Sequence, residues 1–283
     1  MSLIKSVFRY LIPYQVYQKF RSWAYHTLEL KHFRYAEYRK VLKNGGRSKL
    51  KIHFKGHPFI LTDSQSFLFM HDEIFVKEIY KFQAEKAPFI IDCGANIGMS
   101  ILYFKELFPK AEIIAFEPDP TIFKILNRNI SSFNLNNVKT INSALGTLEG
   151  KVDFYSEGSD SGRIGQHIEK SNKISVSQVL LSKYLTKEVD LLKIDIEGAE
   201  TDVIEEIRNE LSFVKRIFIE YHSFINKEST LDRILGVLKA NNFTIHINSP
   251  GVSSNQPFVK TPNKLGMDMQ LNIYGFKTKK NAS

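Results

Sequence analysis

The sequence contains a single cysteine, Cys93, among its 283 residues. An intramolecular disulfide and a cysteine-based zinc site are therefore excluded, and a reducing compartment is the default expectation. No apolar run approaches the roughly 18 residues that a membrane-spanning helix needs. The first nine residues also lack the apolar core and the small-residue cleavage site of a secretory signal. We therefore expect a cytoplasmic protein.

Acidic side chains are scarce at the front of the chain. Residues 1–88 contain 16 basic and 7 acidic side chains, and residues 1–55 alone contain 13 basic and 2 acidic ones, whereas residues 89–283 contain 23 of each. The net charge of +9 therefore comes from the front, and the rest of the protein is neutral. A cationic segment of this kind favours an anionic partner: a membrane surface, a phosphorylated glycolipid or a nucleic acid.

Apolar residues in this cationic segment recur at helical spacing. One such set comprises Ile4, Val7, Phe8, Leu11 and Ile12, and a second set continues after Pro13 to Leu28 with basic residues in between. A basic amphipathic helix can lie in a lipid interface, which predicts peripheral association with the inner membrane face. The alternative is a helix that packs its apolar face on the core, which is the commoner case. We do not expect a nucleic acid, because zinc-finger spacing and an RNP-type aromatic signature are both missing.

Short apolar runs alternate with helical patterns from residue 89 onward. Such runs are typical of strands that are buried on both faces, and their alternation with helices predicts a mostly parallel sheet. We expect a basic segment of helix and hairpin over residues 1–70 and one doubly wound α/β domain over residues 71–283. Within these, we expect a hairpin at 49–61, a helix around 74–82 and an irregular insert with short strands at 150–177. We also expect strands at 89–92, 113–117, 138–143, 189–195, 216–220, 243–248 and 269–276.

A glycine-containing loop follows the first of these buried strands. Gly94 and Gly98 allow a tight turn and the close approach of a ligand, and Asp92 opens the loop. The spacing is Gly-x-Asn-x-Gly, which differs from the Gly-x-Gly-x-x-Gly of dinucleotide binders. An acid at Asp92 would repel phosphate and attract a sulfonium, and Glu117 at the end of the next strand can accept both hydroxyls of a ribose. These two acids indicate S-adenosylmethionine. The alternative is that Asp92 caps a helix and Glu117 is solvated.

Charged residues continue along the fourth predicted strand. Lys193, Asp195 and Glu197 alternate, so they point the same way on an extended segment. Charged groups on a buried strand need partners or a cleft. An alcohol that accepts a methyl group must lose its proton, and histidine is the commonest base for that task. We predict that His222, after the fifth strand, is this base, and that Asp195 or Glu197 orients it or holds the acceptor hydroxyl.

The same carboxylates also allow a metal ion. Asp195, Glu197, Glu220 and His222 could supply the ligands of Mg²⁺ or Mn²⁺, and such an ion can lower the pKa of an acceptor hydroxyl. The sequence leaves both routes open, and we favour the route without a metal.

Three stretches of the chain resemble the FkbM-type family of S-adenosylmethionine-dependent methyltransferases. They are residues 91–98, residues 115–118 and residues 190–200. The resemblance implies a class I methyltransferase fold, a seven-stranded Rossmann-like sheet whose last strand is antiparallel. It also implies O-methylation, often of a sugar hydroxyl in a glycan or of a natural-product alcohol. The implied cofactor site comprises Asp92, Gly94, Asn96, Gly98, Glu117, Pro118, Ser143, Ala144 and Asp195, and the implied catalytic residues are Lys193, Asp195, Glu197 and His222.

Two other classes of function remain possible from the sequence. One is a non-catalytic module with a methyltransferase fold, whose basic front binds a partner. The other is a nicotinamide dehydrogenase, which the missing third glycine disfavours. We expect an O-methyltransferase that acts on a sugar in a glycan or glycolipid, with a small natural-product or lipid alcohol as the alternative acceptor.

Overall fold

The computed structural model describes residues 35–46, 48–84, 87–156, 162–164, 172–225, 227–250, 254, 256–263 and 266–277. The helical pattern predicted for residues 4–28 lies outside them. The chain divides into two compact units between Glu78 and Ile79, and the boundary that the sequence suggests near residue 70 stays a prediction. No helix in the described ranges is long and apolar enough to cross a membrane.

The first unit contains the predicted hairpin. Strands β1 (Leu50–Phe54) and β2 (His57–Leu61) pair antiparallel, and helices α3 (Tyr35–Asn44) and α4 (Ser64–His71) flank them in the chain. The Phe54 ring lies 5.6 Å from that of Phe59 and 5.8 Å from that of Phe67, which places an aromatic core behind the hairpin.

The prediction of a helix around residues 74–82 is wrong about its position. Helix α4 begins at Ser64 because Asp63 caps it, and the Asp63 side chain accepts a hydrogen bond from the Ser66 amide at 2.8 Å. A π-helical turn, η1 (Asp72–Val76), then follows, and Glu78 takes a positive φ of 54° beyond it. The sequence signal that locates this helix is therefore its N-cap, not the apolar residues near its end.

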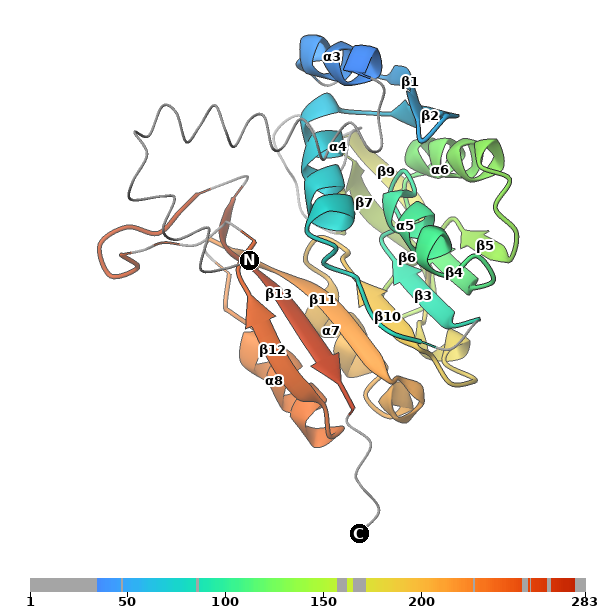
Figure 1. Ribbon diagram of the computed structural model, residues 1–283. Coiled ribbons are helices and arrows are strands. Elements are labelled where there is room, and N and C mark those ends of the chain that lie inside the picture. Colours follow the sequence, from blue (N-terminus) through green and yellow to red (C-terminus); the bar gives the residue numbers. More distant parts are fainter. Residues whose placement is uncertain are drawn as a thin grey trace, which may run out of the picture. The chain divides into compact units, whose positions relative to one another are not determined.

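The second unit is built on one large sheet (Figure 1). Its strands lie in the order β12-β13-β11-β10-β3-β4-β5. Strand β13 runs antiparallel to its neighbours β11 and β12, and the pairs from β11 to β5 are parallel. This confirms the predicted seven-stranded α/β sheet with its last strand antiparallel. The strands are β3 (Phe89–Cys93), β4 (Glu112–Phe116), β5 (Val138–Ile141), β10 (Leu191–Ile194), β11 (Arg216–Phe224), β12 (Thr244–Asn248) and β13 (Met267–Phe276).

Helices cover both faces of this sheet. Figure 1 shows α5 (Met99–Leu107) in front of the sheet and α7 (Glu200–Glu206) and α8 (Leu231–Ala240) behind it. Helix α6 (Pro120–Ser132) connects β4 to β5, and two short 3₁₀ turns, η2 (Ser182–Tyr184) and η3 (Glu210–Phe213), complete the set. Ile217 and Ile219 of β11 pack with Val203 of α7 and Leu238 of α8.

Strand β11 is longer than the sequence predicts, and this places the candidate base inside a strand. It continues to Phe224, because residues 220–224 pair with β13. Side chains alternate across a strand, so Glu220 and His222 lie on the face opposite Ile217 and Ile219.

The insert between β5 and β10 contains the short strands that the sequence predicts, but they are more ordered than expected. Its strands β6 (Ala144–Leu145), β7 (Gly150–Ser156), β8 (Gly162–Ile164) and β9 (Asn172–Val179) form a separate sheet in the order β6-β9-β7-β8. Phe154 and Val176 bury a small core with Ala144, which explains why this segment folds as a sheet.

Candidate active site

The glycine loop after β3 lies directly against the end of β10. The Gly94 and Ala95 amides donate hydrogen bonds to the Phe116 carbonyl at 3.1 and 2.8 Å. Gly94 has a φ of +85°, and a Cβ there would lie 1.8 Å from the Asp195 carbonyl oxygen. The sequence explains this glycine by the approach of a ligand, whereas in the structure the chain's own backbone approaches it. Gly98, with a φ of +94°, is the N-cap residue directly before helix α5.

Glu117, directly after β4, links the end of that strand to this loop. One of its carboxylate oxygens accepts a hydrogen bond from the Asn96 amide at 3.0 Å, and the other accepts one from the Asp119 amide at 2.9 Å. The side chain is buried, and this burial raises the pKa of Glu117 to about 7 although both amide bonds oppose the shift.

Three other residues of the predicted cofactor site lie near Glu117: Pro118, Ser143 and Ala144. Pro118 follows it, and the Asn142 side-chain amide donates to the carbonyls of Glu117 and Pro118 at 2.8 and 2.9 Å. Ser143 and Ala144 come next and are buried. These residues therefore lie at the same carboxyl edge of the sheet as Glu117.

Asp92 lies beneath the loop and is fully buried. Its carboxylate is 3.1 Å from the Lys193 Nζ, and the Ser100 hydroxyl donates to it at 2.5 Å. The Lys193 Nζ also donates to the Gly94 carbonyl at 2.9 Å. Burial opposes the charge of Lys193, but Asp92 and Asp195 outweigh that effect and raise its pKa. Asp92 and Lys193 therefore fix the loop from below.

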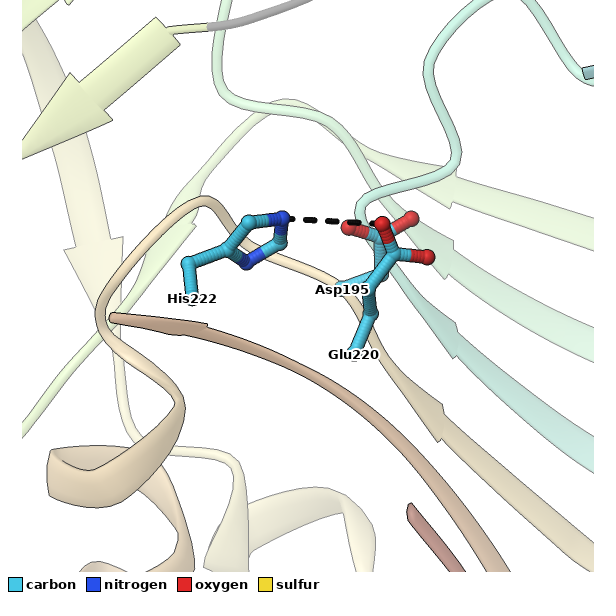
Figure 2. Close-up of side chains that lie close together, drawn as sticks. All are labelled: Asp195, Glu220 and His222. Carbon is cyan, nitrogen blue, oxygen red and sulfur yellow. Dashed lines mark ion pairs between the residues drawn. The ribbon is translucent and has the colours of Figure 1, made fainter. Parts of the chain in front are cut away.

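A second group of side chains surrounds His222. Figure 2 shows its ring directed at the carboxyl groups of Asp195 and Glu220. The Nε2 atom lies 3.5 Å from Glu220 and 3.8 Å from Glu197, and Nδ1 lies 3.0 Å from Glu200. Burial disfavours the charged ring, but Glu197 and Glu200 outweigh burial and raise the pKa of His222 well above its usual value. We call Asp195, Glu197, Glu200, Glu220 and His222 the His222 cluster.

Asp195 and Glu197 are the more open members of the His222 cluster, each with a quarter of its side chain exposed. Burial and the neighbouring Glu220 raise the pKa of Asp195, whereas His222 and Gln270 hold that of Glu220 low against its own burial. Glu197 has a φ of +58°, so the extended alternation predicted from Lys193 onward ends at Asp195 and a turn brings Glu197 to His222.

Glu200 and Gln270 belong to this site but were not identified from the sequence. Glu200, the first residue of α7, is buried and accepts hydrogen bonds from the Gly198 amide at 2.8 Å and from His222. Gln270 of β13 donates its amide to Glu220. The signal for Glu200 is a helix that begins directly after a Glu-Gly turn, whereas Gln270 is found only from the register of β11 and β13.

The Methyltransferase FkbM domain model matches residues 92–245. The chain belongs to the FkbM methyltransferase family. It is 31% identical over 172 residues to Methyltransferase 1 of Beauveria bassiana, which covers 50% of this chain and 68% of that protein. It is 28% identical over 166 residues to the 2-O-methyltransferase NoeI of Sinorhizobium fredii, and the match covers 51% of this chain and 68% of that protein. The hexuronic acid methyltransferase AglP of Haloferax volcanii is 26% identical over 149 residues, and the match covers 51% of this chain and 60% of that protein. The predicted enzyme class, a methyltransferase, is confirmed.

Proposed function

We propose that this methyltransferase transfers the methyl group of S-adenosylmethionine to a sugar hydroxyl in a glycan or glycolipid. One observation carries the proposal: Gly94 of the predicted cofactor loop packs on the backbone of Asp195, a member of the His222 cluster. The loop that would hold the methyl donor and the acids that would receive a hydroxyl proton are therefore direct neighbours.

The residues around Glu117 fit the nucleoside part of the donor. Each Glu117 oxygen takes one backbone amide hydrogen bond, and a carboxylate oxygen can accept two. A ribose diol can therefore donate to the remaining positions. Gly94, Asn96 and Gly98 shape the loop beside it. The donor supplies a methyl group on a positively charged sulfur, and the acidic surroundings favour such a charge.

The His222 cluster fits the other end of the reaction. The acceptor hydroxyl would enter at the exposed sides of Asp195 and Glu197, which can accept its hydrogen bond, and its proton would pass into the cluster. Glu200 holds the His222 ring through Nδ1, so Nε2 faces Glu220 and Glu197. This contact would fix the orientation of the ring that is predicted to act as the base.

Two observations support a sugar acceptor. Carboxylates such as those of Asp195 and Glu197 bind hydroxyl groups. In addition, one relative is named a 2-O-methyltransferase and another a hexuronic acid methyltransferase. The cationic residues 1–55 support an anionic acceptor or an anionic membrane surface as the binding partner of the front segment.

The test is a transfer assay with methyl-labelled S-adenosylmethionine and a panel of nucleotide sugars and oligosaccharides. We expect a methyl ether product that is stable to mild base. Asp195→Asn should abolish its formation. Glu205→Gln is the control, because it changes only an exposed ion pair with Arg233, and it should leave product formation unchanged. If S-adenosylhomocysteine does not bind in calorimetry, the cofactor assignment fails. If it binds but no acceptor is methylated, the non-catalytic module is favoured.

A further inference from the structure

The buried acids near the end of β10 exceed the cations beside them. Among the contacts described, four carboxylates face only two cations, Lys193 and His222: those of Asp92, Asp195, Glu200 and Glu220. Buried carboxylates that lack a matching cation are costly, so such a group favours the binding of a positive charge.

Three members of the cluster have the separation that a metal ion requires. Asp195, Glu220 and His222 each offer one ligand atom, and these atoms all lie within 4.8 Å of one another. Divalent ions bind oxygen at about 2.0–2.6 Å, so their ligand atoms lie about 3–5 Å apart. The three side chains converge from the end of β10 and from β11, as Figure 2 shows.

A second, independent observation lies on the neighbouring strand. Asn272 of β13 is directly opposite Glu220, and Gln270 is opposite His222. Side chains at paired positions share one face of the sheet. Asn272 is only 3% exposed, and its side-chain oxygen has no hydrogen-bond partner among the residues that the structure describes. A buried amide oxygen of this kind is a ligand that hard cations accept.

We propose that Asp195, Glu220 and His222 bind one divalent cation, Mg²⁺ or Mn²⁺, with the Asn272 carbonyl oxygen as a further ligand. The donor set of two carboxylates, one imidazole and one amide oxygen, without a thiolate, suits these ions. Gln270 holds Glu220 in place from outside the ligand set.

The role of the ion in catalysis rests on the proposed function, whereas its binding does not. Beside the acceptor, it would hold the hydroxyl oxygen and make the hydroxyl more acidic. His222 would then serve as a ligand, and Glu197, which lies 3.8 Å from its Nε2, would be the group left to take the proton.

The experiment measures Mn²⁺ binding to the full chain, after treatment with a chelator, by electron paramagnetic resonance and calorimetry. We expect one ion per chain. Asp195→Asn and Glu220→Gln should each weaken binding by about 10-fold or more, since even residues behind metal ligands commonly contribute 10- to 100-fold. Glu205→Gln is the matched control, because it removes an acid of α7 outside the cluster. Asn272→Asp should tighten binding by adding a charge.

Thermal unfolding with and without Mn²⁺ shows whether each variant is folded, and only the variants that keep the site should be stabilised by the ion. Binding that is missing at millimolar Mn²⁺, or that is equal in Asp195→Asn and in the unaltered protein, would overturn the inference. If Mn²⁺ does not bind but the chelator-treated enzyme still methylates a sugar, the proposed function stands and only the metal site fails. If Mn²⁺ binds and no acceptor is methylated, the site stands and the proposed function fails.

Discussion

The titration of Glu117 should control both the stability of the protein and its affinity for the cofactor. Burial raises the pKa of this carboxyl from 4.5 to about 7; Asp119 acts in the same direction, and the amide bonds and Lys193 oppose it. The unfolded chain loses this proton near pH 4.5, whereas the folded chain keeps it to about pH 7. The contribution of Glu117 is therefore fully present below about pH 4.5 and is lost as the pH rises towards 7.

The magnitude follows from the size of that shift. A difference of one pKa unit corresponds to about 1.4 kcal/mol, so the free energy of unfolding should fall by about 3 kcal/mol across this range because of Glu117 alone. Cofactor binding should show the opposite trend, since ribose hydroxyls donate to the ionised carboxylate. Below pH 7, affinity should rise up to about 10-fold per pH unit.

Calorimetric titration with S-adenosylhomocysteine between pH 5.5 and 8.5 measures this effect. Glu117→Gln is the control, because the glutamine amide does not titrate. This variant should bind S-adenosylhomocysteine more weakly, and its affinity should lack the part of the pH dependence that comes from Glu117. Urea unfolding of both proteins over the same range measures the stability. The reasoning is refuted if both proteins show the same slope of affinity with pH, or if the affinity of the unaltered protein falls as the pH rises to 7.

Four further changes have defined outcomes. Gly94→Ala should lower the free energy of unfolding by about 2–4 kcal/mol in urea titrations, whereas Gly266→Ala, with a similar φ of +79° and open space around it, should cost only about 1 kcal/mol. Asp92→Ala should destabilise the fold by about 3–5 kcal/mol in thermal unfolding, because it leaves Lys193 charged and buried without its closest acid. Glu200→Gln should lower kcat with little change in the KM for S-adenosylmethionine, and an unchanged kcat would remove its role in orienting His222. Removal of residues 1–30 should weaken binding to anionic vesicles at low salt, and equal binding at all salt concentrations would contradict the membrane hypothesis.

The sequence predicts the large sheet well because its central strands are short, mostly apolar runs. Every residue of β3 is buried, and so is every residue of β10. The insert is harder to predict, because β7 and β9 alternate polar and apolar residues and pair across a long connection. Neither strand has a buried run of its own, and their regular structure depends on pairing with each other.

The candidate site is predictable only in part, for a related reason. Parallel strands end at one edge, so Asp195 and His222 were expected to be neighbours. The contact between Asp92 and Lys193 depends instead on the register of β3 and β10, in which these two residues are paired directly. A one-residue change of register would reverse the faces, and the sequence of a single strand does not fix it.

That register changes the explanation of how the site would discriminate between ligands. The sequence suggests that the charge of Asp92 attracts a sulfonium and repels a diphosphate. In the structure, Lys193 lies 3.1 Å from Asp92 and cancels most of that charge beneath the loop. Selection against a diphosphate should then depend mainly on Glu117 at one side of the loop and on the acids that surround His222 at the other. Asp92→Asn should therefore change stability more than it changes cofactor preference, whereas Glu117→Gln should do the reverse.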